Sequence, residues 1–329
     1  MDFKTKKGLM MSDDKAGTPL DRLIDQIFTE KELGIQNITP SEFQEIDKLT
    51  QTILTKHDQK SSHHDGMHQK FAEVLKDVKL GIPDMLVGPT GSGKSTLLKQ
   101  VAEKLELEYY PMSVNGQTAE YQIIGYKDAI GRYKRTAFRE AYEKGGLFSF
   151  EEIDAGNPNV LTVINNALSD DFYIFPDKKV RKHKDFRLCA SANTYGYGAT
   201  RQYIGRNPLD AATLNRFAMI TVDYDENLEI QIGPVPEWTL FVQALRHTVS
   251  CWDNNTPPII ISTRAIVSGG WDIKSGTDWD TVLHKFVWRG VALQPETIGT
   301  MKQIDAMKQE AFKEFIKNYL LFKRNNHTK

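Results

Sequence analysis

Five short apolar segments recur along the first two thirds of the chain, each followed by glycine or polar residues. They are residues 84–88, 107–114, 146–151, 186–192 and 218–223. Between them, apolar residues recur at the spacing of a helix face, as in Leu97, Leu98 and Val101. Strands that alternate with helices build a parallel sheet with helices on its faces. The pattern predicts an α/β fold, a three-layer αβα core with a five-stranded parallel sheet.

Two hairpins are also predicted within this part of the chain. One pairs residues 123–126 with 133–136 across a turn at 128–131, and the other pairs 172–175 with 179–182. Further helices are expected at residues 137–142, 158–168 and 209–217.

The chain outside the core is predicted to be helical. Residues 1–18 form a polar tail, and two helical patterns lie between residues 20 and 53. From residue 234 the pattern is helical only, with helices at 237–251, 262–267, 278–291 and within 295–322. We therefore expect an N-terminal tail and helical extension over 1–61, an α/β core over 62–233, and a C-terminal helical lid and tail over 234–329.

The loop after the first strand carries the strongest chemical signal. Residues 88–96 read GPTGSGKST and match the pattern G-x-x-x-x-G-K-[ST] between a strand and a helix. Glycines let the backbone wrap a phosphate with its N–H groups pointing inward, and the helix N-terminus adds positive potential. Lys94 is expected to reach the β- and γ-phosphates, and the Ser95 hydroxyl to bind Mg²⁺. The predicted nucleotide-binding residues are Gly88, Pro89, Thr90, Gly91, Ser92, Gly93, Lys94, Ser95 and Thr96.

An acidic pair and an amide follow two later strands. Glu151 and Glu152 come directly after residues 146–150, and Asn193 follows residues 186–192. Ligands of open α/β sheets bind at the carboxyl ends of the strands. Glu151 can hold the water shell of Mg²⁺, and Glu152 can orient an attacking water. Asn193 can hydrogen-bond that water or the γ-phosphate.

Composition narrows the class of protein. Of 329 residues, 40% are hydrophobic and 26% are charged, which is ordinary for a soluble globular protein. The net charge of −1 gives no global attraction to nucleic acid or membranes. Two cysteines, Cys189 and Cys251, argue against a disulfide framework, and no apolar run approaches about 18 residues. A cytoplasmic location is expected.

Two clusters leave alternatives open. His57, His63, His64 and His68 lie in a polar linker, where metal binding competes with the favoured reading of a solvated linker near a bound adenine. Residues 178–184 contain four lysines and one arginine. A solvated loop is favoured there over contact with a polymer or partner, because charge runs usually face solvent.

The order of these motifs resembles AAA+ ATPases of the MoxR branch, and within it the CobS/NorQ/CbbQ-like, dynein-related type. The resemblance covers about residues 62–290 and includes segments 146–148, 151–155, 192–194, 209–217 and 262–265. It implies that Lys94 and Ser95 are the Walker A lysine and Mg²⁺ ligand, and that Glu152 is the Walker B glutamate. Asn193 resembles the sensor 1 amide. Glu151 stands where the family usually has aspartate, and its longer side chain is expected to accept from Mg²⁺-bound water.

The same resemblance assigns arginines to a subunit interface. Arg216 resembles an arginine finger. Such a residue is supplied by a neighbouring subunit and stabilises the negative charge of the transition state of phosphoryl transfer. Arg206 or Arg201 is expected to assist it, and Arg264 resembles the sensor 2 residue of the lid. A finger supplied in trans requires a ring, and the resemblance implies six subunits.

The function expected is that of an ATP- and Mg²⁺-dependent ring motor that remodels or activates a client protein, or inserts a metal or cofactor. The resemblance also implies a partner with a von Willebrand A domain. Three alternatives stay open: a nucleic-acid-dependent motor such as a helicase loader or translocase, a cobaltochelatase subunit of the CobS type, and a nucleotide-gated assembly scaffold.

Overall fold

The computed structural model describes residues 66–250 and 259–289, with 306–308, 310–311, 313–315 and 318. The predicted N-terminal tail and extension lie outside the described residues, as do His57, His63 and His64. Most of the segment 295–322 also lies outside them.

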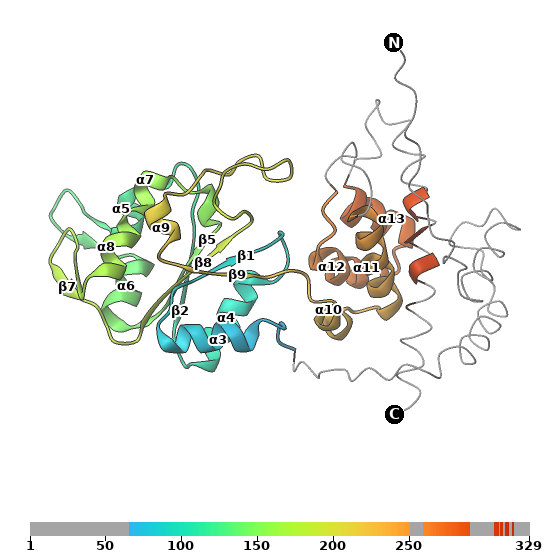
Figure 1. The fold of residues 1–329 in the computed structure, drawn as a ribbon, viewed down its shortest axis with the longest axis horizontal. Coiled ribbons are helices and arrows are strands. Elements are labelled where there is room, and N and C mark those ends of the chain that lie inside the picture. Colours follow the sequence, from blue (N-terminus) through green and yellow to red (C-terminus); the bar gives the residue numbers. More distant parts are fainter. Residues whose placement is uncertain are drawn as a thin grey trace, which may run out of the picture.

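A five-stranded parallel sheet forms the centre of the core (Figure 1). Its spatial order is β2-β5-β8-β1-β9, and every pairing is parallel. The strands are β1 (Asp84–Val87), β2 (Tyr109–Ser113), β5 (Gly146–Glu151), β8 (Phe186–Ala192) and β9 (Ala218–Thr221). Each lies within two residues of its predicted bounds, so the predicted sheet is confirmed. Because all strands run the same way, their carboxyl ends lie at one edge.

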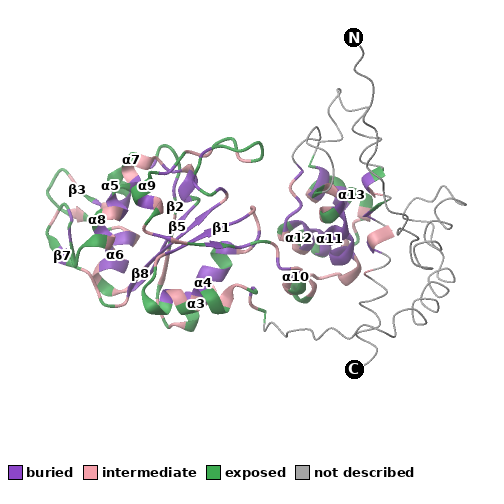
Figure 2. Ribbon diagram, in the orientation of Figure 1, coloured by how far each residue is buried: buried purple, intermediate pink, exposed green. Residues whose placement is uncertain are grey.

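Helices cover both faces of the sheet and make three layers (Figure 1). On one face α3 (Phe71–Leu80) and α4 (Lys94–Lys104) bury Val78 and Leu97 against Leu86. On the other face α6 (Ala137–Lys144) buries Phe138 against Met85 and Phe148. Successive strand residues point to opposite faces, so both faces of a central strand must be apolar. The central strands β1 and β5 are buried throughout and β8 at all but one residue, whereas the edge strands β2 and β9 are partly exposed (Figure 2). Each such side chain contributes about 1.5–3 kcal/mol on burial.

The two hairpins differ from each other in how well the sequence predicted them. The second is the expected antiparallel hairpin, β6 (Phe172–Ile174) with β7 (Lys179–Arg181). In the first, only β3 (Tyr126–Lys127) and β4 (Tyr133–Lys134) pair. The expected strand at Ile123 is wrong, because α5 (Glu120–Ile124) forms there and buries Ile123 fully. The Gln122 side chain caps this helix by accepting a hydrogen bond from the Ala119 N–H.

Two predicted helices of the core are shorter than expected. The helix over 158–168 is divided into α7 (Pro158–Leu161) and α8 (Val163–Ser169) at Thr162, whose hydroxyl donates to the Asn159 carbonyl. The helix over 209–217 is reduced to α9 (Ala211–Leu214). The Asp210 side chain caps its start by accepting from the Ala212 N–H.

One helix that the sequence did not predict lies just before residue 234, the expected start of the helical lid. The unpredicted α10 (Glu226–Ile232) starts at an Asp225 cap and packs on α11 and α12. The other described lid elements are α11 (Pro236–Ser250), α12 (Thr263–Lys274), α13 (Trp279–Leu283) and a π-helical turn at His284–Trp288. Among the described helices, none is long and apolar enough to cross a membrane.

Helix α12 continues past its predicted end at residue 267, and its further turns pack Gly269 closely against the lid core. A Cβ on Gly269 would lie 2.8 Å from the ring of Trp238, which is fully buried. Glycine lowers helix propensity, but close packing against this indole compensates. The Trp238 Nε1–H also donates to the Ala265 carbonyl in the same helix.

Asp84, the first residue of β1, is a buried carboxyl group without a hydrogen-bond partner among the described residues. Burial raises its pKa from 3.8 to about 8, and the negative charges of Asp77 and Glu73 add to the shift. The unfolded chain therefore releases this proton at a lower pH than the folded chain. The contribution of Asp84 to stability is fully present below about pH 4 and is lost as the pH rises to about 8.

We predict that Asp84→Asn stabilises the protein more at pH 8 than at pH 5, because the amide cannot ionise. The expected difference is on the order of 1–3 kcal/mol. Thermal unfolding of both proteins at the two pH values measures it. The exposed Asp170→Asn serves as the control and should show no pH-dependent gain. Equal effects of Asp84→Asn at both pH values would contradict the assignment.

Candidate active site

The glycine-rich loop, residues 88–93, joins β1 to α4 at the carboxyl edge of the sheet. It lines a pocket of about 620 Å³ together with Glu151, Glu152, Asn193 and residues of α12. Gly91 has a positive φ of 76°, and a Cβ there would lie 2.8 Å from the Cβ of Ser262. The loop therefore contacts the start of the lid, and the pocket is bounded by core and lid alike.

Lys94 is buried at the base of this pocket. Its Nζ donates to the carbonyls of Gly88 and Pro89 at 2.8 and 2.9 Å, and to Asn193 Oδ1 at 3.1 Å. Burial lowers the pKa of Lys94 to about 8, although the nearby carboxylates, Asp154 foremost, oppose the shift. The predicted lysine and sensor amide thus lie together, on α4 and at the end of β8.

The carboxylate of Glu151 accepts hydrogen bonds from four hydroxyl groups. The donors are Ser95 at 2.5 Å, Ser191 at 2.6 Å, Tyr109 at 2.8 Å and Ser149 at 3.0 Å. Burial and the Glu151 charge raise the pKa of Tyr109, so its hydroxyl stays a donor. The glutamate therefore reaches the Ser95 hydroxyl despite its greater length than aspartate.

Ser95 and Glu151 present the hard oxygen donors that Mg²⁺ prefers, and their contact fits the predicted metal site. His68 does not support a separate metal site. Its Nε2 lies 2.9 Å from the Asp223 carbonyl, and its Nδ1 accepts from the Lys70 N–H. Within the described residues, no cluster of three or more histidine, cysteine or acidic side chains could hold a metal. His68 and Gly66 do line the pocket, at the end of the predicted linker.

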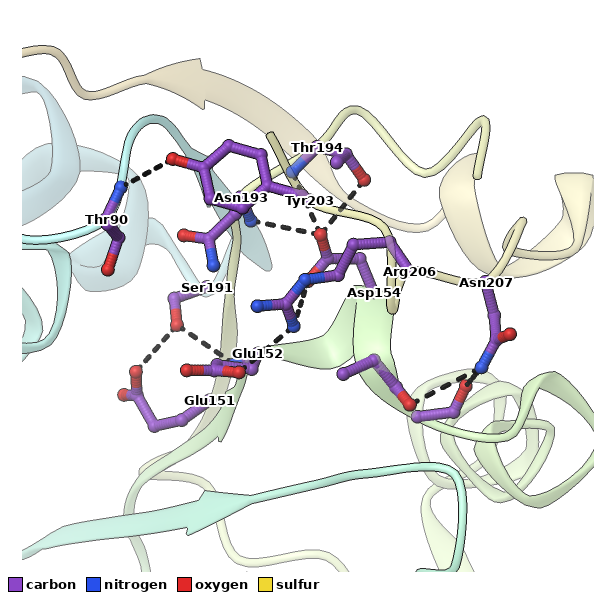
Figure 3. Close-up of polar contacts among 12 residues, drawn as sticks. Thr90, Glu151, Glu152, Asp154, Ser191, Asn193, Thr194, Tyr203, Arg206 and Asn207 are labelled. Carbon is purple, nitrogen blue, oxygen red and sulfur yellow. Dashed lines mark hydrogen bonds and ion pairs between the residues drawn. The ribbon is translucent and has the colours of Figure 1, made fainter. Parts of the chain in front are cut away.

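Glu152 leaves β5 in a left-handed conformation with a φ of 56°, and its side chain is 57% exposed. Arg206 Nη1 lies 3.0 Å from its Oε2 and 3.4 Å from Oδ1 of the buried Asp154 (Figure 3). Arg206 was predicted to assist a neighbouring subunit. In this structure its guanidinium binds two carboxylates of its own chain.

Arg216 lies away from the glycine-rich loop. It lines a second pocket, of about 1160 Å³, with Arg181, Lys182 and Lys184 of the basic run. Its Nε donates to Asn165 Oδ1 at 2.8 Å. The predicted solvated loop is therefore partly a pocket wall. Arg264 lines the pocket at the glycine-rich loop, and its contact with nucleotide stays a prediction.

Sequence reasoning missed four residues that organise the site. Tyr109 and Ser191 hold Glu151, Asp154 anchors Arg206, and the Tyr203 hydroxyl accepts from the Thr90 N–H at 3.0 Å. The position of Asp154, two residues after Glu152, could have indicated its role in the site. The others become visible only once the strand order and the path of the loop before α9 are known.

Part of the chain is similar in sequence to known proteins. Residues 83–217 match the family described as AAA domain (dynein-related subfamily). The aerobic cobaltochelatase subunit CobS of Sinorhizobium sp is 30% identical over 171 residues, 47% of this chain and 51% of that protein. An uncharacterized protein of Staphylococcus aureus is 26% identical over 164 residues, 46% of this chain and 59% of its own length. The chain thus spans only 51–59% of these curated relatives.

Two solved structures are more distant in sequence. A putative ATPase from Cytophaga hutchinsonii is 17% identical with a TM-score of 0.41, covering 64% of this chain and 60% of that one. NtrX from Brucella abortus is 14% identical with a TM-score of 0.45, and the match covers 78% of this chain and 58% of NtrX. The family match confirms the resemblance predicted from the motifs: residues 83–217 are similar to AAA domains of the dynein-related subfamily.

Proposed function

We propose that this protein is a Mg²⁺-dependent ATPase that works as a ring and remodels or activates a client protein. The observation that carries the proposal is the convergence of four groups on one pocket between core and lid. The glycine-rich loop, Glu151, Glu152 and Asn193 all line it, with Arg264 on the lid side. These groups match the parts that phosphoryl transfer requires: phosphate binding, metal binding, activation of water and contact with the γ-phosphate.

The chain's own groups divide the work. Lys94 exchanges the carbonyls of Gly88 and Pro89 for phosphate oxygens. Ser95 and Glu151 would hold Mg²⁺, which would neutralise phosphate charge when bound. Glu152 accepts a proton from the attacking water, and Asn193 contacts the γ-phosphate.

Arg216 acts on the nucleotide of a neighbouring subunit. It lies two residues before β9, at the amino edge of the sheet, whereas the glycine-rich loop lies at the carboxyl edge. A four-residue strand spans about 13 Å, and this separation of Arg216 from its own loop supports a role toward the nucleotide of a neighbour. A head-to-tail interface that closes by rotation makes a ring, for which the family implies six subunits.

Hydrolysis moves the lid against the core and so acts on the client. The contact between Gly91 and Ser262 ties the phosphate-binding loop to the start of α12. A conformational change of the loop on phosphate release therefore moves the start of α12 and with it the lid. We expect a partner with a von Willebrand A domain to deliver the client.

A second candidate is a cobaltochelatase subunit, in which the same motor drives cobalt insertion into a macrocycle. The 30% identity to CobS supports it. Cobalt insertion that needs this protein and ATP, measured in a reconstituted assay with the corrin-ring partners, would favour this candidate over other clients.

We predict that affinity for ATP falls as the pH rises above about 8, because free Lys94 loses its proton there and phosphate binding must restore it. The fall is up to about tenfold per pH unit. Titration calorimetry in two buffers at about pH 9 should show proton uptake on binding. Lys99→Ala, an exposed lysine on the same helix, should keep this behaviour, whereas Lys94→Ala should abolish binding. An affinity for ATP that stays constant between about pH 7 and about pH 9.5 would contradict the role of Lys94.

We also predict that two inactive variants complement each other. Glu152→Gln and Arg216→Ala should each bind ATP but turn it over at least about 100-fold more slowly. Mixed before assembly in equal amounts, they form some interfaces with an intact Glu152 and an intact Arg216, about a quarter of the total for random mixing. Steady-state phosphate release should recover accordingly. A mixture as inactive as its components would place Arg216 outside the trans role, and full activity in Glu152→Gln would remove Glu152 from its role.

A further inference from the structure

Asp154 is fully buried beside the end of β8, and its carboxylate makes four polar contacts. Its Oδ2 accepts from the Asn193 N–H at 3.1 Å, the Thr194 N–H at 2.9 Å and the Thr194 hydroxyl at 2.9 Å. Its Oδ1 lies 3.4 Å from Arg206 Nη1. The carboxylate is therefore fixed to the backbone of the residue proposed to contact the γ-phosphate.

Arg206 connects the buried carboxylate of Asp154 to the exposed carboxylate of Glu152. Its side chain is only 12% exposed, and the same Nη1 lies 3.0 Å from Oε2 of Glu152. Glu152 is 57% exposed, so little packing restricts its rotamer. A charge-assisted hydrogen bond to a guanidinium that is itself anchored selects one orientation of the carboxylate.

The loop that carries Arg206 is held at two more points (Figure 3). The Asn207 N–H donates to the Asp154 carbonyl at 2.7 Å, and its side-chain amide donates to the Gly156 carbonyl at 3.0 Å. Tyr203, on the same loop, accepts from the N–H of Thr90 in the glycine-rich loop. The position of the Arg206 backbone is thus set by both the segment after β5 and the phosphate-binding loop.

We propose that Arg206 is a positioning residue that acts in its own subunit: through Asp154, it orients the Glu152 carboxylate relative to Asn193. This inference rests on the proposed function, since it assumes that Glu152 is the base and Asn193 contacts the γ-phosphate. It replaces the role in trans expected from the sequence, because two carboxylates of the same chain already bind this guanidinium.

The expected size of the effect follows from what is lost. Without Arg206, the exposed Glu152 samples several rotamers, and misplacement of a reacting group by about 1 Å costs up to about 100-fold in rate. ATP binding depends mainly on the glycine-rich loop and Lys94, which Arg206 does not contact. The loss should therefore lie in kcat and not in nucleotide affinity.

The first test compares Arg206→Ala and Arg206→Lys in the full chain. Arg206→Ala should lower kcat for ATP by about 10- to 100-fold with an ATP Kd within about twofold of the parent. Arg206→Lys keeps the charge but loses the planar fork, so it should recover part of kcat. Arg132→Ala removes the same charge from an exposed turn and should change neither quantity. Circular dichroism verifies folding, and Arg206→Gln substitutes for the alanine variant if that one does not fold. A normal kcat in the folded variant overturns the inference.

The second test separates action within a subunit from action across the interface. If Arg206 serves its own Glu152, a mixture of Arg206→Ala with Glu152→Gln leaves every interface with a damaged catalytic base and stays slow. A mixture of Arg206→Ala with Arg216→Ala should recover, because some interfaces then combine an intact base with an intact finger. The reverse pattern overturns the inference and returns Arg206 to the trans role. Recovery in neither mixture also overturns it.

The Glu152→Gln and Arg216→Ala variants test the proposed function separately from the role of Arg206. If Glu152→Gln and Arg216→Ala fail to complement each other, or if Glu152→Gln turns over normally, the ring mechanism fails regardless of Arg206. If those two behave as expected while Arg206→Ala is as active as the parent, only the present inference fails.

Discussion

The parallel pairing of β5, β8 and β1 brings three strand ends to one edge of the sheet. The register joins Phe150 to Ala190 and Val87 to Ala192, so the residues that follow these strands emerge side by side. Glu152, Asn193 and the glycine-rich loop occupy those positions. The same constraint makes the strands hydrophobic on both faces, because helices cover the sheet on either side. Core stability and site geometry therefore depend on one set of backbone hydrogen bonds.

Charge at this edge is tolerated because almost every buried group has partners. Glu151 accepts from four hydroxyls, and Asp154 accepts from two backbone amides, a hydroxyl and Arg206. Lys94 is satisfied by carbonyl and amide oxygens, yet burial still lowers its pKa. A buried ammonium with neutral partners gains more from phosphate oxygens than an exposed lysine does, since little water has to be removed. The Lys94 ammonium is therefore placed to prefer a phosphate oxygen to its present neutral partners.

The sequence predicted the sheet and the glycine-rich loop well because their signals are local. Apolar runs bounded by polar residues define β1 and β8, and the phosphate-binding motif needs only its own flanking strand and helix. Contacts between distant segments could not be predicted this way. Tyr109 reaches Glu151 only because β2 pairs with β5, and Arg206 reaches Glu152 only because its loop folds back over the segment after β5. At Gly269 and Ile123, tertiary burial overrode the local preference that favoured a helix end and a strand.

The neutral total charge conceals a separation of charge between the two edges of the core. Glu151, Glu152 and Asp154 lie at the carboxyl edge, whereas Arg216 shares a pocket with the basic side chains of residues 181–184 at the amino edge. In a head-to-tail ring of the kind proposed, the basic edge of one subunit faces the nucleotide-binding edge of the next. Complementary potentials of this sort set the orientation of association and exclude the reversed contact, in which like charges would meet. ATP adds negative charge to the carboxyl edge, so nucleotide binding and assembly reinforce each other through the same electrostatic term.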